Sequence, residues 1–452
     1  MHKIEVILFQ IRELLWSAPL LFSIIALGLY LTFRLKGIQF KYLFYSLKLL
    51  IVPKKSEKDN VGELSPFQSI MTALAGAIGT GSIAGVAIAI SIGGYGSIFW
   101  LWITSLFGMI ISFSENTLAI KYRTHDKDGQ IVGGPMYTLQ NGVNSKKLGQ
   151  LFAFLGASAA FGIGATVQSN SVATALNFMY GVPLALTGIT FSLLAILVIF
   201  GGVKSIGKVA SLLVPFMSIL YIISSLIILI VFYKNLIPAL NKIVVNAFSL
   251  QAQIGGFAGA SILTAVQMGA ARSIFSSEAG LGSSPIAAIN ARTSHPAEYG
   301  MLSMAAVFIS SIIICSMTAL VIIVTDSLGE VDNHGLLMSG AQLTLSAFGK
   351  GYHFTKNIVL VCLIFFGFTT LLTWAYYGEK CIEYLLKKNA ILYYRLIYII
   401  LIFLGSLINV HLIWAYADIA NALMIIPNLF GVAYLSNIII KEKNDYVKNH
   451  IK

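Results

Sequence analysis

The chain has 452 residues, of which 57% are hydrophobic and only 11% are charged. Because soluble domains carry roughly a quarter of their residues as Asp, Glu, Lys or Arg, this composition excludes an ordinary soluble protein. The net charge of +12 does not indicate a nucleic-acid partner, because the Lys and Arg residues lie between apolar runs and not on one soluble face.

Apolar runs follow one another along the chain, each long enough to cross the roughly 30 Å of hydrocarbon in a bilayer. The first run ends at Arg34 and Lys36 without a small-residue cleavage site, so we interpret it as a retained helix and not as a signal peptide. The sequence predicts eleven spans, at residues 14–34, 67–92, 97–121, 151–178, 182–201, 209–233, 254–290, 300–325, 357–384, 391–410 and 412–438.

The positively charged residues predict the orientation of these spans. If the N-terminus lies outside, 23 of the 30 Lys and Arg residues fall in cytoplasmic loops or the C-terminal tail, 6 lie on the external side, and Arg272 lies inside a span. Cytoplasmic loops of membrane proteins are enriched in Lys and Arg. The sequence therefore predicts an external N-terminus and a cytoplasmic C-terminus.

Two spans are interrupted well inside their apolar runs. The second carries GTGSIAG (79–85), and the seventh, too long for one straight helix, carries FSSEAGLGSSP (275–285). Glycine costs a helix interior roughly 1 kcal/mol relative to alanine, and loosened backbone at membrane depth survives only where it is buried or lines a wet cavity. Close helix packing at Gly81 and Gly85 is the alternative for one break alone.

The arrangement of the two breaks indicates a binding site. With the first span set aside, ten helices remain, and the first helix of each five is the interrupted one. In such pairs, half-helix N-termini present free N–H groups to an anionic ligand and exposed carbonyl groups coordinate a cation. Paired breaks at corresponding positions therefore favour a transporter.

A structural role is the simplest interpretation of the acidic residues inside the spans. Glu115, Glu278 and Asp418 are the acids expected there, and Glu278 lies at the second break. Its carboxylate could cap exposed N–H groups or pair with Arg272 or Arg292, and we favour this structural role over proton or amine binding. The seven histidines fall mostly in loops or tails and the three cysteines lack metal-ligand spacing, so the sequence predicts neither a metal site nor a histidine proton relay.

Several long motifs resemble the alanine/glycine:cation symporter family. They are residues 65–123, GGPMY (133–137), QSNS (168–171), SIFSSEAGLGSSPIAAINART (273–293) and TTLLTW (369–374), in the family's order. The resemblance implies an all-α polytopic membrane protein with a leucine-transporter-type fold of two inverted five-helix repeats, broken first and sixth core helices and one extra N-terminal helix. Ser82 replaces the asparagine that usually follows GTG, and Tyr95 replaces the proline of GGPG, which bears on substrate preference.

The resemblance also implies the substrate site. Backbone N–H groups of Thr80 and Gly81 would meet the substrate carboxylate, while Phe275 and Trp374 would wall the pocket and limit it to a small side chain. Thr370 lies one turn before Trp374, so the two share a helix face, and its hydroxyl could serve substrate or cation. A further candidate is Gln168, because an unpartnered amide in hydrocarbon is costly; contact with substrate and bonding between helices remain open for it.

The wider fold implies a sodium site made of oxygen atoms, which a hard cation prefers. Its predicted ligands are the carbonyl groups of Ala75, Ile78 and Phe366 and the hydroxyl groups of Thr369 and Thr370. Sodium would be the coupling ion, with no other cofactor.

These expectations combine into one prediction. Residues 1–60 form an N-terminal helix and basic loop, residues 61–440 a transporter core with repeats at about 65–235 and 250–438, and residues 441–452 a cytoplasmic tail. The chain would sit in the cell membrane, contact the lipid bilayer, and carry small neutral amino acids with sodium by alternating access. A proton-coupled transporter of another small solute on the same fold is the nearest alternative. A channel is a more remote one, and so is an intramembrane enzyme, because the sequence contains no recognisable catalytic set.

Overall fold

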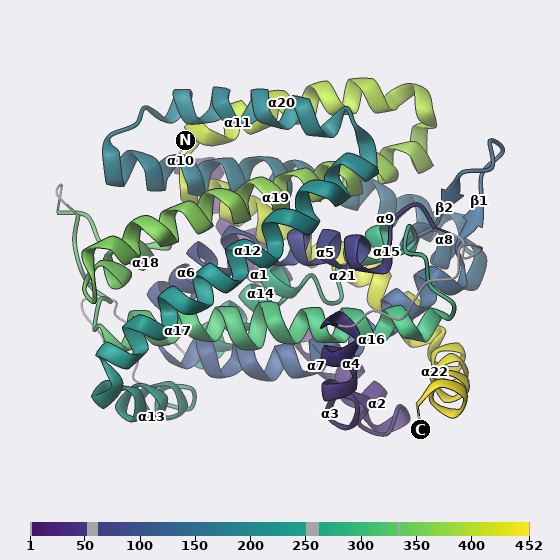
Figure 1. The fold of residues 1–452 in the computed structure, drawn as a ribbon, viewed down its shortest axis with the longest axis horizontal. Helices are drawn as coiled ribbons and strands as arrows, with labels where there is room; N and C mark the ends of the chain where they lie inside the picture. The colour runs from purple at the N-terminus through teal and green to yellow at the C-terminus, as the bar shows by residue number, and fades with distance from the viewer. Residues whose placement is uncertain (1, 52–61, 250–261, 333–334, 452) are drawn as a thin grey trace.

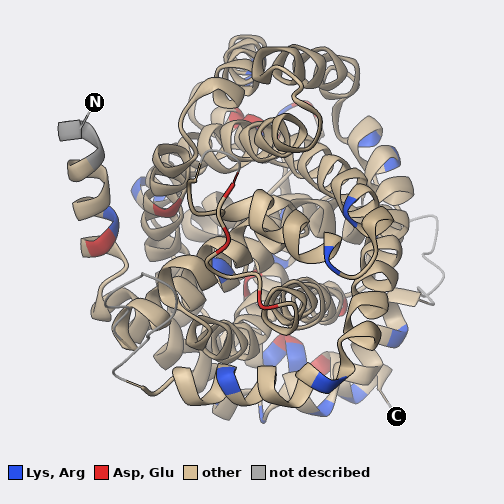
Figure 2. Ribbon diagram, turned by 90° about the vertical axis from the view of Figure 1, so that its left-hand side faces the viewer, with Lys and Arg blue, Asp and Glu red and all other residues tan. Residues whose placement is uncertain are grey.

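The computed structural model describes residues 2–51, 62–249, 262–332 and 335–451. Most of them are helical, and Figure 1 shows that long helices such as α7, α16 and α19 run roughly along the long axis of the molecule. Short helices α13 and α18 lie at one end of this bundle, and the two-residue strands and helix α22 lie at the other. Figure 2, a view along the bundle, shows long stretches of helix without a charged residue.

The predicted spans coincide with helices over the described residues. Eight helices are long and apolar enough to cross a membrane, and the bent pair Pro66–Ala77 and Thr80–Gly93 makes a ninth if counted as one span. The shorter helix α11 and the interrupted segment after residue 262 account for the other two predicted positions. Residues 254–261 of the seventh predicted span lie outside the described residues.

The N-terminal region contains one helix more than predicted. Helix α1 (His2–Leu15) precedes α2 (Ala18–Arg34), and the pair packs on α21 (Val410–Tyr434) and α7 (Gly96–Lys121). The indole of Trp16, between the two helices, donates a hydrogen bond to the Asp418 carbonyl oxygen at 2.9 Å. Because charged residues near both ends of α1 leave only short apolar stretches, a search for long continuous apolar runs starts too late in the chain to find it.

The first interrupted span begins with a well-defined helix. Ser65 accepts a hydrogen bond from the Gln68 N–H while the Gln68 side chain accepts one from the Ser65 N–H, a capping box that starts α5 (Pro66–Ala77). A 3-10 turn, η1 (Thr80–Ser82), then leads into α6 (Ala84–Gly93), and the axis bends by 53° at this break.

The rest of the chain follows the same helical pattern. The two strands form a small antiparallel hairpin. The remaining elements are α3 (Ile38–Lys41), α4 (Leu43–Ile51), β1 (Thr124–His125), β2 (Ile131–Val132), α8 (Pro135–Tyr137), η2 (Thr138–Gly142), α9 (Lys146–Ala159), η3 (Ala160–Thr166), α10 (Val167–Tyr180), α11 (Leu184–Ile199), α12 (Gly202–Val231), η4 (Tyr233–Asn235), α13 (Leu236–Asn246), α14 (Ile262–Ser277), α15 (Ser284–Ala288), α16 (Pro296–Val307), η5 (Phe308–Ile314), α17 (Cys315–Val324), α18 (Gly340–Gly349), α19 (His353–Leu386), η6 (Lys388–Ala390), α20 (Ile391–Leu407) and α22 (Ser436–His450).

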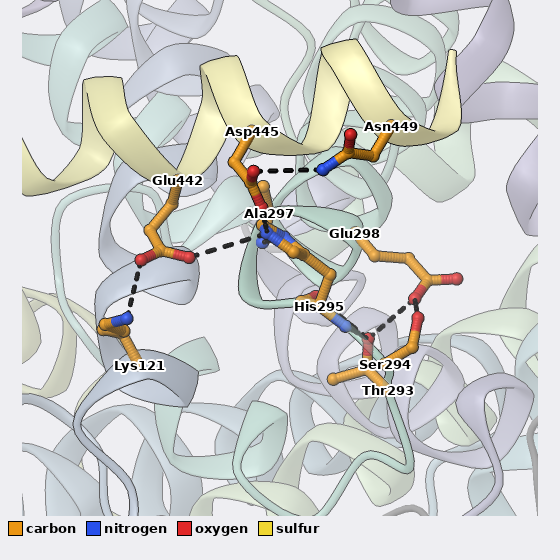
Figure 3. A network of polar contacts seen from close by, with 9 residues as sticks. All are labelled: Lys121, Thr293, Ser294, His295, Ala297, Glu298, Glu442, Asp445 and Asn449. Carbon is orange, nitrogen blue, oxygen red and sulfur yellow. Dashed lines mark hydrogen bonds and ion pairs between the residues drawn. The ribbon is translucent and has the colours of Figure 1, made fainter.

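The last fifteen residues before Ile451 form a docked helix. Glu442 on α22 pairs with Lys121 at the end of α7 at 2.7 Å, and Asp445 lies 3.1 Å from His295 in the loop before α16 (Figure 3). Tyr446 is fully buried against the core. The predicted tail at 441–452 is therefore mostly helix in contact with the bundle.

Candidate functional site

The two helix breaks lie against each other. A Cβ added to Gly81 in the first break would lie 2.4 Å from ring atom Cδ1 of Phe275 in the second, so only glycine leaves room for this approach. Close by, the hydroxyl groups of Ser82 and Ser276 are 2.7 Å apart. The fold therefore brings together two motifs that are almost 200 residues apart in sequence.

Gln168 bonds the first break to α10. Its Oε1 accepts hydrogen bonds from the N–H of Thr80 at 3.1 Å and from the hydroxyl of Thr80 at 2.9 Å, and its Nε2 donates to the Ile163 carbonyl oxygen at 2.9 Å. The sequence left substrate contact and bonding between helices open for Gln168, and in this structure Gln168 makes a bond between helices. The Thr80 N–H is thus hydrogen-bonded to Gln168 in this state, which differs from the expectation that it is free for a ligand. Gly81 lies under the Phe275 ring.

The predicted sodium ligands come together in part. Thr370 on α19 donates its hydroxyl to the Ala75 carbonyl oxygen on α5 at 2.6 Å, so these two oxygen atoms already face each other across the helices. Thr369 instead donates to carbonyl groups of its own helix, at 2.9 Å to Phe365 and 3.2 Å to Phe366. Ile78 directly follows the last residue of α5, where the regular helix stops.

Trp374 and Phe275 have different neighbours. Trp374 packs against the backbone at Gly164 and lies 5.5 Å, centroid to centroid, from the Tyr377 ring. The ring that stacks on Phe275, at 4.8 Å, belongs to Trp414 of α21. Sequence reasoning missed Trp414, because a single tryptophan in an apolar span carries no signal of what it faces.

A buried ion pair lies beside these aromatic rings. Arg272 on α14 pairs with Asp418 on α21, both side chains are at most 2% exposed, and the guanidinium lies 4.6 Å from the Trp414 ring centroid. Arg272 is therefore not the partner of Glu278, which was one of the options that the sequence left open. Arg292 instead donates to the Gly62 carbonyl oxygen at 3.0 Å.

A cavity of about 280 Å³ lies next to the ion pair, and its lining includes Phe9, Arg12, Met268, Arg272, Trp414 and Asp418. Trp414 lines this cavity and also stacks on Phe275, which covers Gly81. The Phe275–Trp414 pair therefore separates the cavity from the first break. The side chains predicted to bind substrate (Thr80, Gln168, Phe275, Thr370 and Trp374) are 0–4% exposed, so this structure is closed around them.

The loop of the second break is held by an acid from another helix. After α14 ends at Ser277, Glu278, Gly280 and Gly282 all adopt positive φ angles. Glu115 on α7 accepts hydrogen bonds from the N–H groups of Gly280 and Gly282, both at 3.2 Å, and from the Asn428 amide at 2.6 Å. The sequence placed Glu115 inside a span but gave no sign of this partner.

Comparisons with known proteins agree with this architecture. The chain matches the sodium:alanine symporter family over residues 1–452. It is 42% identical to the sodium/alanine symporter AgcS of Methanococcus maripaludis, covering 98% of each chain, and 36% identical to the probable sodium/glutamine symporter GlnT of Bacillus subtilis, covering 97% and 89%. The crystal structure of MhsT in complex with L-phenylalanine superposes with a TM-score of 0.57 at 14% identity, over 84% of this chain and 90% of that one, which shows a similar fold.

Proposed function

The chain belongs to the sodium:alanine symporter family, and from this premise we propose that it carries a small neutral amino acid, alanine or glycine, across the cell membrane together with sodium. Members of this family are secondary transporters, which confirms the predictions of a multi-pass membrane protein and of a protein that is not an enzyme.

The observation that carries the proposal is the contact between the breaks. Gly81, in the 3-10 turn between α5 and α6, meets Phe275 in the last turn of α14. The Gly81 N–H would meet the substrate carboxylate there, since a helix N-terminus attracts an anion. Phe275 would limit the substrate side chain from one side and Trp374 from the other, with Thr370 and Gln168 between them. Little space remains, which favours alanine or glycine.

The sodium site is proposed between α5 and α19. Carbonyl groups of Ala75, Ile78 and Phe366 and hydroxyl groups of Thr369 and Thr370 would supply five oxygen ligands. The 2.6 Å contact between Thr370 and the Ala75 carbonyl oxygen supports this position. A cation bound there would hold the first break against α19, so sodium and amino-acid affinities would depend on each other.

We propose alternating access on eleven spans, with inverted repeats at about 65–235 and 250–438, an external N-terminus and a cytoplasmic C-terminus. The cavity beside Arg272 and Asp418 would then be the external approach, closed in this structure by Phe275 and Trp414. Rocking of one helix bundle against the other would open the site first to one side and then to the other.

The test is uptake of radiolabelled alanine into proteoliposomes, with and without an inward sodium gradient, for the wild type and Trp374→Ala. We expect saturable, sodium-dependent accumulation that the variant loses. Accumulation driven equally well by a proton gradient would support the proton-coupled alternative. Because one relative is a probable sodium/glutamine symporter, glutamine is included as a competitor, and its transport in preference to alanine would refute the proposed substrate.

A further inference from the structure

Two buried carboxylates with opposite surroundings lie at the second break, Glu115 on α7 and Glu278 in the loop itself. Glu115 receives three hydrogen bonds, two from backbone N–H groups and one from Asn428. Glu278 lies in the same loop, is 0% exposed, and neither of its carboxylate oxygens has a hydrogen-bond donor in bonding geometry. The Glu115 carboxylate therefore has hydrogen-bond partners, and the Glu278 carboxylate has none.

The position of Glu278 indicates that its side chain is needed. Its φ of +58° is a left-handed conformation that strains a residue with a Cβ, whereas Gly280 and Gly282 adopt similar angles freely. The carboxylate points at the first break, because a Cβ added to Gly76 would lie 2.8 Å from Glu278 Oε1 and 3.0 Å from Tyr377 Oη. Glycine at residue 76 leaves this space open.

Other unpartnered oxygen atoms surround this carboxylate. Ser283, Trp374 and Tyr377 supply the nearest side-chain donors, and the hydroxyl groups of Ser283 and Tyr377 are themselves buried without a hydrogen-bond partner. The Glu278 carboxylate and the hydroxyl groups of Ser283 and Tyr377 thus converge beside the last turn of α5, and none of them has a hydrogen-bond partner.

No positive side chain compensates the charge among the residues that the structure describes. Arg272 pairs with Asp418, and Arg292 bonds to the Gly62 carbonyl oxygen. The nearby Glu115, which bonds to Gly280 and Gly282 of the same loop, is a second acid and offers no positive charge. Burying a carboxylate with neither partner nor hydrogen bonds is very costly, so the arrangement calls for a cation.

We propose that Glu278, with the hydroxyl oxygens of Ser283 and Tyr377, binds a sodium ion at the junction of the two breaks. This site is separate from the one proposed between Ala75 and Thr370, and as a second coupling site it rests on the proposed sodium symport. A proton would neutralise the carboxyl group and let it donate to at most one of the two hydroxyl oxygens, whereas sodium can coordinate the carboxylate and both hydroxyl oxygens at once. The bound ion would join α5, the second break and α19.

The test is equilibrium binding of radioactive sodium to the purified full chain, without amino acid and without a gradient. We expect two sodium ions per wild-type chain, one in Glu278→Gln, one in Thr370→Val and none in the double variant. Glu379→Gln is the matched control, because Glu379 is a largely buried acid of α19 that already pairs with Arg395 at 2.7 Å, so this variant should keep both ions.

A milder variant guards against misfolding of Glu278→Gln. Tyr377→Phe removes one hydroxyl and should keep two ions, with a roughly tenfold weaker affinity for one of them. If Glu278→Gln still binds two sodium ions, the second site is overturned. The proposed sodium symport survives that result as long as uptake by the wild type needs sodium. Loss of only the pH dependence of uptake in that variant would assign a proton to Glu278 and overturn the site too. A wild type that binds no sodium would overturn both proposals.

Discussion

Replacing Gly81 by alanine tests whether the contact between the two breaks is the working site. The added Cβ would lie 2.4 Å from Cδ1 and 2.7 Å from Cε1 of Phe275, where about 3.5–4 Å is the favourable separation of two carbon atoms. The Phe275 ring cannot simply retreat, because it already stacks on Trp414 at 4.8 Å. The closed state must therefore open by about 1 Å at its centre or distort.

Overpacking of this kind costs about 1–3 kcal/mol, which corresponds to a roughly 5- to 150-fold lower population of the closed state. We expect sodium-driven alanine uptake by Gly81→Ala to fall within that range, with the protein still folded. Gly85→Ala, on the same interrupted span, is the control: its Cβ would lie 3.2 Å from the edge of the Trp414 ring and should cost much less.

A second substitution should relieve the contact that Gly81→Ala creates. Phe275→Leu in the Gly81→Ala background removes ring atoms from the contact and should recover part of the lost uptake, although Phe275→Leu alone impairs it. Uptake by proteoliposomes and a size-exclusion profile measure both properties. Wild-type uptake in Gly81→Ala, or no recovery in a correctly folded double variant, would show that this contact does not limit transport.

Two more predictions concern the polar framework. Glu115→Gln replaces a carboxylate that accepts from two backbone N–H groups by an amide with one acceptor, so one buried N–H loses its partner at a cost of about 1–3 kcal/mol. A lower unfolding temperature in detergent than that of the wild type would support this, and an unchanged temperature would contradict it. In the loop of β1 and β2, the hydrogen bond from Lys388 and the N–H of Gln130 hold the pKa of Asp126 below its usual value, so this contact is formed at neutral pH and is lost as the pH falls below about 4. Hydrogen exchange of the Asp128 and Gln130 amides, corrected for intrinsic rates, should accelerate in that pH range in the wild type, and a Lys388→Gln variant should already exchange faster at neutral pH.

The sequence by itself determined most of the long helices and the positions of the breaks. The predicted span 97–121 corresponds to α7 (Gly96–Lys121), and 391–410 to α20 (Ile391–Leu407). These features are local, because the cost of placing each residue in hydrocarbon and the cost of glycine in a helix depend on the residue and its immediate neighbours.

Only the tertiary structure decided which groups meet. Glu115 bonds to Gly280, Arg272 pairs with Asp418, and Trp414 stacks on Phe275, in each case across more than 130 residues of chain. The sequence named most of these residues but offered Glu278 as the partner of Arg272, because charge alone cannot distinguish two acids in different spans. Such choices depend on how the helices rotate and pack against one another, which no local pattern of residues records.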